Sequence, residues 1–374
     1  MRYCQSCLLP DTRPNLEIMP DGRCNACHSW TDKKDAIDWA ARARAFDDLV
    51  AGLKRKNAEW DCVIPVSGGK DSTWQVIKAL EYGLKPLCVT WRTPARNAIG
   101  QRNLDNLINL GVDHIDFTIN PDVEKRFTIE AFKKGGSLAI PMHMALFAIP
   151  LQLAIKFKIP LVLWGENSAM EYGGKDENVL GFQMTRAWLK KYGVTQGTVA
   201  DDWVSDDLSL KDLAVYQWPS DQDMDAAGVT AAFLGWYLPW DPQETFRVAQ
   251  EHGFEALTDK PKVGFYKFAD VDDEFIITLH HWMKWYKFGF TRLWDNLSLE
   301  IRSGRMTRDQ AIKVLHETGD EYPQEAVDKF CRWSGLTEQQ FLDIAEAFRN
   351  KDIWYQEDGK WKLKGFLLSN VDWA

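Results

Sequence analysis

Short apolar runs alternate with amphipathic stretches over the first half of the chain. The apolar runs predict strands, which lie at 62–66, 86–91, 114–119 and 159–168. The amphipathic stretches predict helices, which lie at 72–83, 100–111 and 145–157. Short buried strands that alternate with helices predict an α/β fold with a doubly wound parallel sheet. Ligands of such a sheet bind beyond the carboxyl ends of its strands.

Outside this region, apolar residues recur at helical spacing. Upstream, the spacing predicts a single helix that joins the first thirty residues to the sheet. Downstream, it predicts capped helices at 241–253, 307–319 and 337–350, and 231–240 is compatible with a further strand. The expected parts are a cysteine module at 1–32, a linker helix at 33–58, a sheet domain at 59–268 and a mainly helical subdomain at 269–374.

The chain has 374 residues, of which 45% are hydrophobic and 26% charged, and its formal net charge is -9. This negative net charge disfavours the binding of nucleic acid through a broad positively charged surface. The amino terminus does not resemble a signal peptide, and Lys156 and Lys158 interrupt the most apolar stretch, 142–164. We expect that stretch to form a buried helix and strand in a cytoplasmic protein without a membrane segment.

Tryptophan is unusually frequent, with eighteen residues in the chain. Packing in the core and at interfaces is the ordinary role of such side chains and is expected to explain most of them. A few could instead form the floor of a pocket for a sugar ring or a base. The candidates in the middle and second half include Trp203, Trp218, Trp236, Trp240, Trp282, Trp285 and Trp294.

Four cysteines near the amino terminus follow the spacing C-x2-C-x16-C-x2-C, and they are Cys4, Cys7, Cys24 and Cys27. Each C-x2-C pair can form a turn that offers two thiolates to one ion. Two such turns supply four thiolates, which predicts a structural zinc site. Unrelated cysteines or two disulfides are the alternatives. Because four thiolates close the coordination sphere, His28 is expected to be a bystander. The remaining cysteines form no such pair, and they are Cys62, Cys88 and Cys331.

The hexapeptide S-G-G-K-D-S follows the first predicted strand and opens the first predicted helix. A Walker A loop is excluded, because it would need glycine at Ile64 and a hydroxyl residue at Asp71. The glycines let backbone amides approach an anion, and the helix amino end adds positive potential. Ser67 and Ser72 can donate hydrogen bonds, and Lys70 can offset phosphate charge. Asp71 is suited to binding magnesium.

In this strand-to-helix context the hexapeptide resembles the pyrophosphate loop (PP-loop) of the N-type ATP pyrophosphatases, whose domain is adenine nucleotide alpha-hydrolase-like. The matching residues are Ser67, Gly68, Gly69, Lys70, Asp71 and Ser72. The resemblance implies that the sheet domain cleaves ATP between the α and β phosphates. Pyrophosphate would be held in the loop with magnesium, and AMP would be placed on a carbonyl oxygen. Lys70 and Asp71 would act in catalysis.

The cysteine quartet, CVIPVSGGKDSTW and LVLWGENSAMEYGG together resemble the N-acetyl sugar amidotransferase family of bacterial lipopolysaccharide O-antigen and flagellin-glycan biosynthesis. The resemblance spans most of the chain. It implies that ATP and ammonia convert the N-acetyl group of a nucleotide-linked sugar into an acetamidino group. It also implies two partners that deliver ammonia, a glutaminase subunit and a cyclase-like barrel subunit. The chain itself has Arg2 where one kind of glutaminase needs cysteine, and it has no G-x-C-x-G elbow for the other kind.

The resemblance extends to the ends of two strands. Gly165, Glu166 and Asn167 follow the fourth strand, where the α-phosphate and metal are expected. Glu166 would bind magnesium and Asn167 would orient the acyl group, although both could simply cap the next helix. Thr90 and Trp91 end the second strand, where adenine and ribose are expected.

Four further expectations concern other residues. The stretch Glu171 to Gly174 is expected to extend over the site and meet the substrate. Arg92 suits either the nucleotide or a plain surface position. His143 lies in an apolar helix and is expected to be a core histidine rather than a catalyst. Pro65 lacks a backbone donor, so we expect it at the end of the first strand.

Two other functions remain open at this point. A tRNA thiolation enzyme would keep the ATP chemistry and change the substrate, but the acidic charge and the lack of a paired cysteine near the loop disfavour it. A non-catalytic zinc-ribbon scaffold that retains nucleotide binding is the second alternative. The intact hexapeptide disfavours that scaffold.

Overall fold

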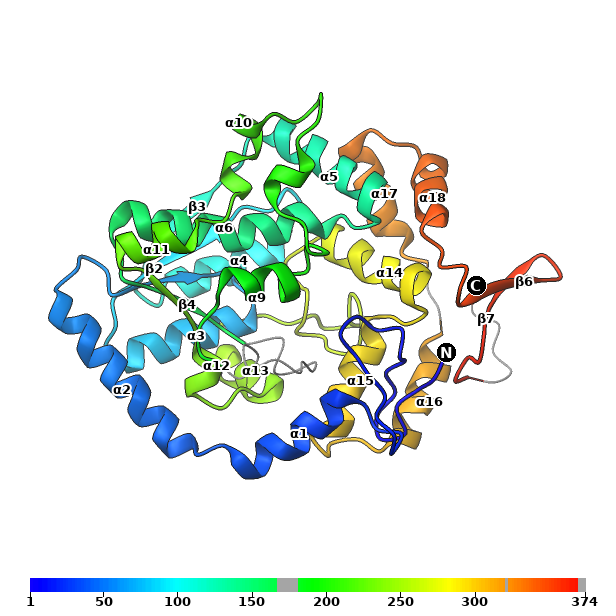
Figure 1. Cartoon of the computed structure of the whole chain (residues 1–374), viewed down its shortest axis with the longest axis horizontal. Helices are drawn as coiled ribbons and strands as arrows, with labels where there is room; N and C mark the ends of the chain where they lie inside the picture. The colour runs from blue at the N-terminus through cyan, green and yellow to red at the C-terminus, as the bar shows by residue number, and fades with distance from the viewer. Residues whose placement is uncertain (167–180, 320–321, 369–374) are drawn as a thin grey trace.

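The computed structural model describes residues 1–166, 181–319 and 322–368, and for residues 32–36 the backbone alone. Within these ranges the central sheet has five parallel strands in the order β3-β2-β1-β4-β5 (Figure 1). Helices cover both faces of this sheet, and further helices form the carboxyl-terminal region. The predicted α/β fold, with an amino-terminal cysteine module and a helical carboxyl-terminal region, is therefore confirmed.

The strands lie close to the predicted positions. They are β1 (Cys62–Pro65), β2 (Pro86–Trp91), β3 (Asp113–Phe117), β4 (Leu161–Trp164) and β5 (Thr230–Phe233). Pro65 is the last residue of β1, as expected. The strand suggested at 231–240 is correct only for its first residues. The short helix α12 (Leu234–Tyr237) follows β5 at once, because the Gly235 amide turns to donate to the Gly165 carbonyl, 3.0 Å away.

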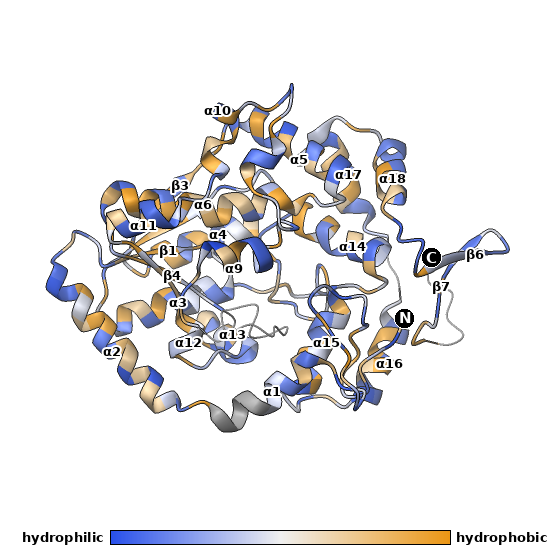
Figure 2. Ribbon diagram, in the orientation of Figure 1, coloured by the Kyte–Doolittle hydropathy of each residue, from blue (hydrophilic) through white to orange (hydrophobic). Residues whose placement is uncertain are grey.

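Both faces of β1, β2 and β4 are buried, which explains the uninterrupted apolar runs in these strands, whereas the edge strand β3 is partly exposed and carries polar residues. One face packs on α5 (Pro121–Gly135) and α6 (Ala139–Phe157), and its strand residues include Val63, Leu87, Val89 and Val162. The other face packs on α2 (Trp39–Lys56), α3 (Lys70–Glu81), α4 (Ala98–Ile108) and α13 (Pro242–Glu251). Figure 2 shows hydrophobic residues concentrated on these strands and on α6.

Among the described helices, α6 alone is long and apolar enough to cross a membrane. However, 56% of its most apolar window is buried inside the protein. Its buried residues belong to the same core as β1 and β4. The expectation of a buried helix that leads into a buried strand is therefore confirmed.

The segment between β4 and β5 adds short helices to the edge of the sheet. Its described elements are α9 (Arg186–Tyr192), η1 (Ala200–Trp203), α10 (Leu210–Leu213), η2 (Ala214–Tyr216) and α11 (Asp221–Ala227). The Met184 amide donates to the Ala231 carbonyl, which holds the start of this segment against β5.

The carboxyl-terminal region is mainly helical, as predicted. It contains α14 (Ile276–Phe288), α15 (Arg292–Arg302), α16 (Arg308–Thr318), α17 (Gln324–Ser334) and α18 (Glu338–Ala347). An antiparallel hairpin of β6 (Trp354–Glu357) and β7 (Lys360–Leu363) follows and was not predicted. Its turn is Asp358-Gly359, with both residues at positive φ, and this dipeptide is a strong hairpin signal.

The cysteine module packs on the carboxyl-terminal helices and shares one core with them. Leu8 and Leu9 are fully buried in the same cluster as Trp294 and Leu297 of α15. Met1 lies beside the segment that follows β7, because its amino group is 3.3 Å from the Lys364 carbonyl. The first and last segments of the chain therefore form one structural unit.

The single linker helix expected after the cysteine module is wrong. The structure has two helices, α1 (Asn25–Ala36), which begins directly after Cys24, and α2. The break occurs at Asp38, whose carboxylate accepts a hydrogen bond from the Ala41 amide at 2.9 Å. An aspartate in this position satisfies an amide at the start of a helix and so begins a new one.

A buried ion-pair network joins the module to α14 and α15. The Asp295 carboxylate accepts from Arg13 Nε at 2.9 Å and from Lys284 Nζ at 3.0 Å, and its side chain is 1% exposed. These two cations hold the pKa of Asp295 well below its usual range, against the opposing effect of burial.

We expect Asp295→Ala to lower the free energy of unfolding by about 3–5 kcal/mol, because it leaves two cations without their buried partner. The control is Glu317→Ala, which breaks an exposed pair with Lys313 at 3.7 Å. That control should cost less than about 0.5 kcal/mol. Urea unfolding followed by circular dichroism measures both values, and equal losses would contradict a role for the network.

Candidate functional site

A cavity of about 190 Å³ lies beyond the carboxyl ends of β1 and β4. These neighbouring strands are where the strand order reverses, so the connections after them diverge and leave a crevice. From the sheet domain it is lined by Ser67, Gly69, Lys70, Asp71, Ser72, Glu166, Trp240 and Pro242. The other wall is formed by Tyr266, by residues 268–272 and by Arg292, Asn296 and Leu299 of α15. Ligand pockets usually measure about 300–1,000 Å³, so this cavity suits the phosphate part of a nucleotide.

The loop after β1 depends on the absence of a side chain at Gly68. This residue has φ +86, which L side chains rarely adopt. A Cβ at this position would lie 2.6 Å from the Leu104 amide nitrogen of α4. The backbone of α4 therefore fixes the path of the loop, and only glycine fits at this point.

The amino end of α3 is open toward the cavity. The helix begins at Lys70, two residues before the predicted start at Ser72, and its N-cap is Gly69, which supplies no side-chain cap. Inside the loop, the Gly69 amide donates to Ser67 Oγ at 3.2 Å and the Ser72 hydroxyl donates to the Gly69 carbonyl at 3.0 Å. An uncapped helix amino end is suited to binding an anion.

Lys70 and Asp71 form a polar cluster with a residue that the sequence did not single out. Lys70 Nζ lies 2.5 Å from Asp71 Oδ1 and 3.3 Å from the hydroxyl of Thr245 on α13. The Thr245 hydroxyl is 3.0 Å from the same Asp71 oxygen. The ammonium also lies 5.4 Å from the Phe268 ring. These contacts hold the side chain of Lys70 at the cavity, with 7% of the residue exposed.

The carboxyl-terminal wall brings further charge into the cavity. Burial raises the pKa of Asp272, and the charge of Asp270 raises it further, against a hydrogen bond from Ser67. Arg292 Nε is 3.8 Å from Asp270 Oδ2. The Asn97 amide at the start of α4 donates to the Asp272 carbonyl at 3.2 Å, which fixes this segment beside the loop.

The residues after β4 are placed as follows. Gly165 faces the Trp240 ring so closely that an added Cβ would lie 2.9 Å from it. Glu166 lines the cavity. Asn167 and the stretch from Glu171 to Gly174 lie outside the described residues.

The expected adenine and ribose residues do not line this cavity. Thr90 Oγ1 is 2.9 Å from His114 Nε2, and the Trp91 indole donates to Glu124 Oε1 at 2.8 Å. Both side chains are buried among neighbouring elements. Arg92 is largely exposed and points toward Asp116, 3.7 Å away.

His143 also lies apart from the cavity. Its Nδ1 is 2.7 Å from the Ala139 carbonyl one helical turn earlier. Burial lowers its pKa to about 4, so the ring is neutral at physiological pH. This is the environment expected of a core histidine.

The carboxylates at the cavity could hold magnesium together with a phosphate ligand. Among the described residues, no group of three carboxylates converges closely enough to bind an ion alone. Magnesium in nucleotide sites usually takes one or two carboxylates and completes its shell with phosphate oxygens and water. Asp71 and Glu166 from the sheet domain and Asp272 from the other wall are suited to this role.

The cysteine module contains a cluster suited to zinc. The ligand sulfurs of Cys4, Cys7, Cys24 and Cys27 lie within 4.8 Å of one another, and all four residues are buried. The Cys4–Cys27 and Cys7–Cys24 sulfur distances are 3.8 Å. A tetrahedral ion with Zn–S bonds of about 2.3 Å needs sulfurs about 3.8 Å apart. His28 instead pairs with Asp21 at 3.0 Å on the surface.

Sequence reasoning missed the residues from distant segments that line the cavity or, like Thr245, contact its lining residues. They are Thr245, Tyr266, Phe268, Asp270, Asp272 and Arg292. The acidic run D-V-D-D-E at 270–274 is the only visible signal, and acidic runs usually lie on solvated surfaces.

A family described as "LPS biosynthesis protein WbpG-like, C-terminal domain" matches residues 252–367. No curated protein matches the chain. Among solved structures, the NMN synthetase from Francisella tularensis shares 16% identity over 59% of this chain and 98% of its own. The TM-score of that pair is 0.27, which is too low to support a statement about activity. The family match thus covers the segments that form the second wall of the cavity.

Substitution of Gly68 tests the close contact between the loop and α4. We expect Gly68→Ala to reduce stability and ATP binding, because the loop must move away from Leu104. The control is Gly111→Ala, since Gly111 has φ +96 but nothing within 4 Å of an added Cβ. In that control the free energy of unfolding should fall only by about 1–2 kcal/mol, the cost of a left-handed backbone at a residue with a side chain, and ATP affinity should stay unchanged. Urea unfolding and calorimetric ATP titration measure the two effects, and equal ATP affinity in both variants would refute the role of this contact.

Metal analysis tests the cysteine cluster. We expect the purified protein to contain one zinc ion per chain and Cys24→Ser to lose it, with a lower thermal midpoint, because folding and metal binding are coupled. Cys331→Ser is the control, since this half-buried cysteine lies outside the cluster. Elemental analysis and thermal melts provide the readouts. Full zinc content in Cys24→Ser would contradict the assignment.

Proposed function

We propose that this protein is an ATP-dependent, AMP-forming amidotransferase of lipopolysaccharide biosynthesis. It converts the N-acetyl group of a nucleotide-linked sugar into an acetamidino group. The observation that carries the proposal is a single cavity with two walls of different origin. One wall is the S-G-G-K-D-S loop, and the other belongs to the segment that matches the lipopolysaccharide family.

The loop residues suit a departing pyrophosphate. The open amino end of α3 offers amides to phosphate oxygens. The hydroxyls of Ser67 and Ser72 donate to Asp272 and to the Gly69 carbonyl in this structure, and they would turn to phosphate oxygens when a nucleotide binds. Lys70 is held at the cavity and offsets the negative charge that develops on the leaving group. Asp71 and Glu166 would bind magnesium, which neutralises phosphate charge when bound.

The reaction then has two steps. The amide oxygen of the sugar attacks the α-phosphorus of ATP, and the bond to the β-phosphate oxygen breaks to release pyrophosphate. Ammonia adds to the imidate carbon, and AMP departs with the former amide oxygen. A proton from the added ammonia passes to solvent or to a basic side chain, and the acetamidino group remains. Asn167 is proposed to orient the acyl group.

Ammonia is proposed to come from a glutaminase subunit together with a cyclase-like barrel subunit. All seven cysteines of this chain lie in its described part. Four of them form the metal cluster, and Cys62 and Cys88 are buried in the sheet, where burial raises the pKa of both thiols. Cys331 is half-buried, and burial raises its pKa as well. None of these environments activates a nucleophilic thiol.

The same observations disfavour tRNA thiolation. No cysteine is among the described residues that line the cavity, so no thiol there could carry sulfur. The acidic net charge of -9 likewise disfavours a nucleic acid substrate.

The test is pyrophosphate release from ATP, with ammonium salts replacing the partner glutaminase. We expect release only with a nucleotide-linked N-acetyl sugar, and a product lighter by the difference between oxygen and NH in mass spectrometry. Turnover without any acetamido sugar, or none with a broad panel of them, would refute the proposed reaction.

Asp71→Asn should lower this release by at least about a hundredfold, because it removes the metal-binding charge at the loop. The matched control is Asp48→Asn on the exposed side of α2, which should keep full activity. Thermal melts of both variants separate a loss of chemistry from a loss of folding.

A further inference from the structure

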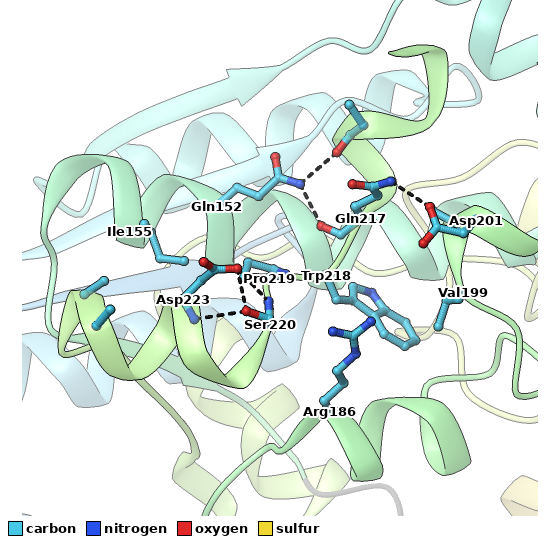
Figure 3. A pocket seen from close by; sticks show the side chains of 14 residues that line it. Gln152, Ile155, Arg186, Val199, Asp201, Gln217, Trp218, Pro219, Ser220 and Asp223 are labelled. Carbon is cyan, nitrogen blue, oxygen red and sulfur yellow. Dashed lines mark hydrogen bonds between the residues drawn. The ribbon is translucent and has the colours of Figure 1, made fainter. Parts of the chain in front are cut away.

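A second, larger hollow lies on the opposite edge of the sheet. It has a volume of about 710 Å³, is open to solvent and is lined by residues of α6, α9, α11 and the η1 and η2 turns (Figure 3). Ile155 and Ala227 line it just before the amino ends of β4 and β5. The candidate nucleotide site instead follows the carboxyl ends of β1 and β4. The two hollows are therefore separate sites.

Two glutamines leave hydrogen-bond acceptors in this hollow. Gln152 Nε2 donates to the Ala214 carbonyl at 3.1 Å and to the Gln217 carbonyl at 2.8 Å. Gln217 Nε2 donates to Asp201 Oδ1 at 2.8 Å (Figure 3). Their amide nitrogens are thus used within the protein. Their carbonyl oxygens have no donor among the described residues.

The charged side chains in the hollow also favour a ligand that donates hydrogen bonds. Asp201 and Asp223 contribute two carboxylates, and the Asp223 Oδ2 atom accepts from the Ser220 amide and hydroxyl, while its other oxygen has no donor in the described part of the chain. Among the described residues that line the hollow, Arg186 is the single cation. A ligand with negative charge is disfavoured here, because two carboxylates outweigh one guanidinium.

An aromatic ring completes the hollow. Trp218 lines it with 7% of the residue exposed, and its indole nitrogen has no hydrogen-bond partner in the described structure. Figure 3 shows Arg186 next to this ring. Because so little of the ring is exposed, only its edge can meet a ligand. An apolar edge beside open acceptors suits a ligand that has C–H groups and several hydrogen-bond donors.

We infer that this hollow is a second binding site, for a saccharide that carries hydroxyl or amino groups and no net negative charge. The hydroxyl or ammonium donors would meet Gln152, Gln217 and the two carboxylates, and C–H groups of the sugar would meet the exposed edge of Trp218. Phosphates and nucleotides do not match this set of acceptors. The inference is independent of the proposed reaction, because the hollow lies on the other edge of the sheet.

Saturation-transfer NMR on the full chain tests the inference, with methyl glucosaminide as the probe. This amino sugar has no acetamido group, so its binding does not depend on the proposed amidotransferase activity. We expect saturation transfer to the probe that persists with excess ATP. Ala226→Arg, which places a bulky cation in the hollow from α11, should weaken probe affinity by about tenfold or more.

The matched control is Asp225→Arg, a neighbouring exposed position of α11 that does not line the hollow. It should bind the probe as the unchanged protein does, and both variants should have the same thermal midpoint. Three outcomes would overturn the inference: no transfer to the probe, unchanged binding in Ala226→Arg, or equally strong binding of glucose 1-phosphate at the same site.

Discussion

The candidate nucleotide site depends on how closely two segments approach the backbone of α4. Gly68 of the loop lies so near Leu104 that a side chain would overlap the helix backbone. On the same helix, an added Cβ at Gly100 would lie 2.7 Å from Asp272. The helix therefore holds the loop on one side and the carboxyl-terminal wall on the other. The width of the cavity between these walls is fixed by two close contacts, at Gly68 and at Gly100, where no side chain fits.

A hydrogen-bonded chain connects the same walls on the side of α13. The Arg305 guanidinium donates to Glu300 of α15 at 2.9 Å and to Asp241 at 2.8 Å. Asp241 caps α13, the helix that carries Thr245 to within 3.0 Å of Asp71. A shift of the carboxyl-terminal helices would thus move Asp241 at the start of α13, and through Thr245 of that helix it would affect Asp71 in the loop. The family match covers residues 252–367, which include the second wall of the cavity. This segment therefore completes the site that the loop begins and is more than an appended domain.

The sequence predicts those features that local patterns determine. Apolar runs buried on both faces located the strands, and the glycines and Asp71 located the loop. Contacts between distant segments have no such signal. Asp272 approaches the loop only after folding, and Thr90 and Trp91 turned out to bond to His114 and Glu124 because β3 and α5 pack beside β2. Asp358-Gly359 and Asp38 carried local signals that were overlooked.

The cysteine cluster and the cavity are connected through α15. The four cysteines belong to the same core as Trp294 and Leu297 of that helix, and Arg13 reaches Asp295 on it. The opposite side of α15 contributes Arg292 and Asn296 to the cavity. Asn296 Oδ1 also accepts from the Phe265 amide at 3.0 Å, just before the segment that forms the second wall. A metal bound by the first residues of the chain would therefore stabilise α15, a helix that lies near the other end of the sequence and lines the cavity. Since the small module has few apolar residues of its own, metal coordination and packing on α15 must supply most of its stability.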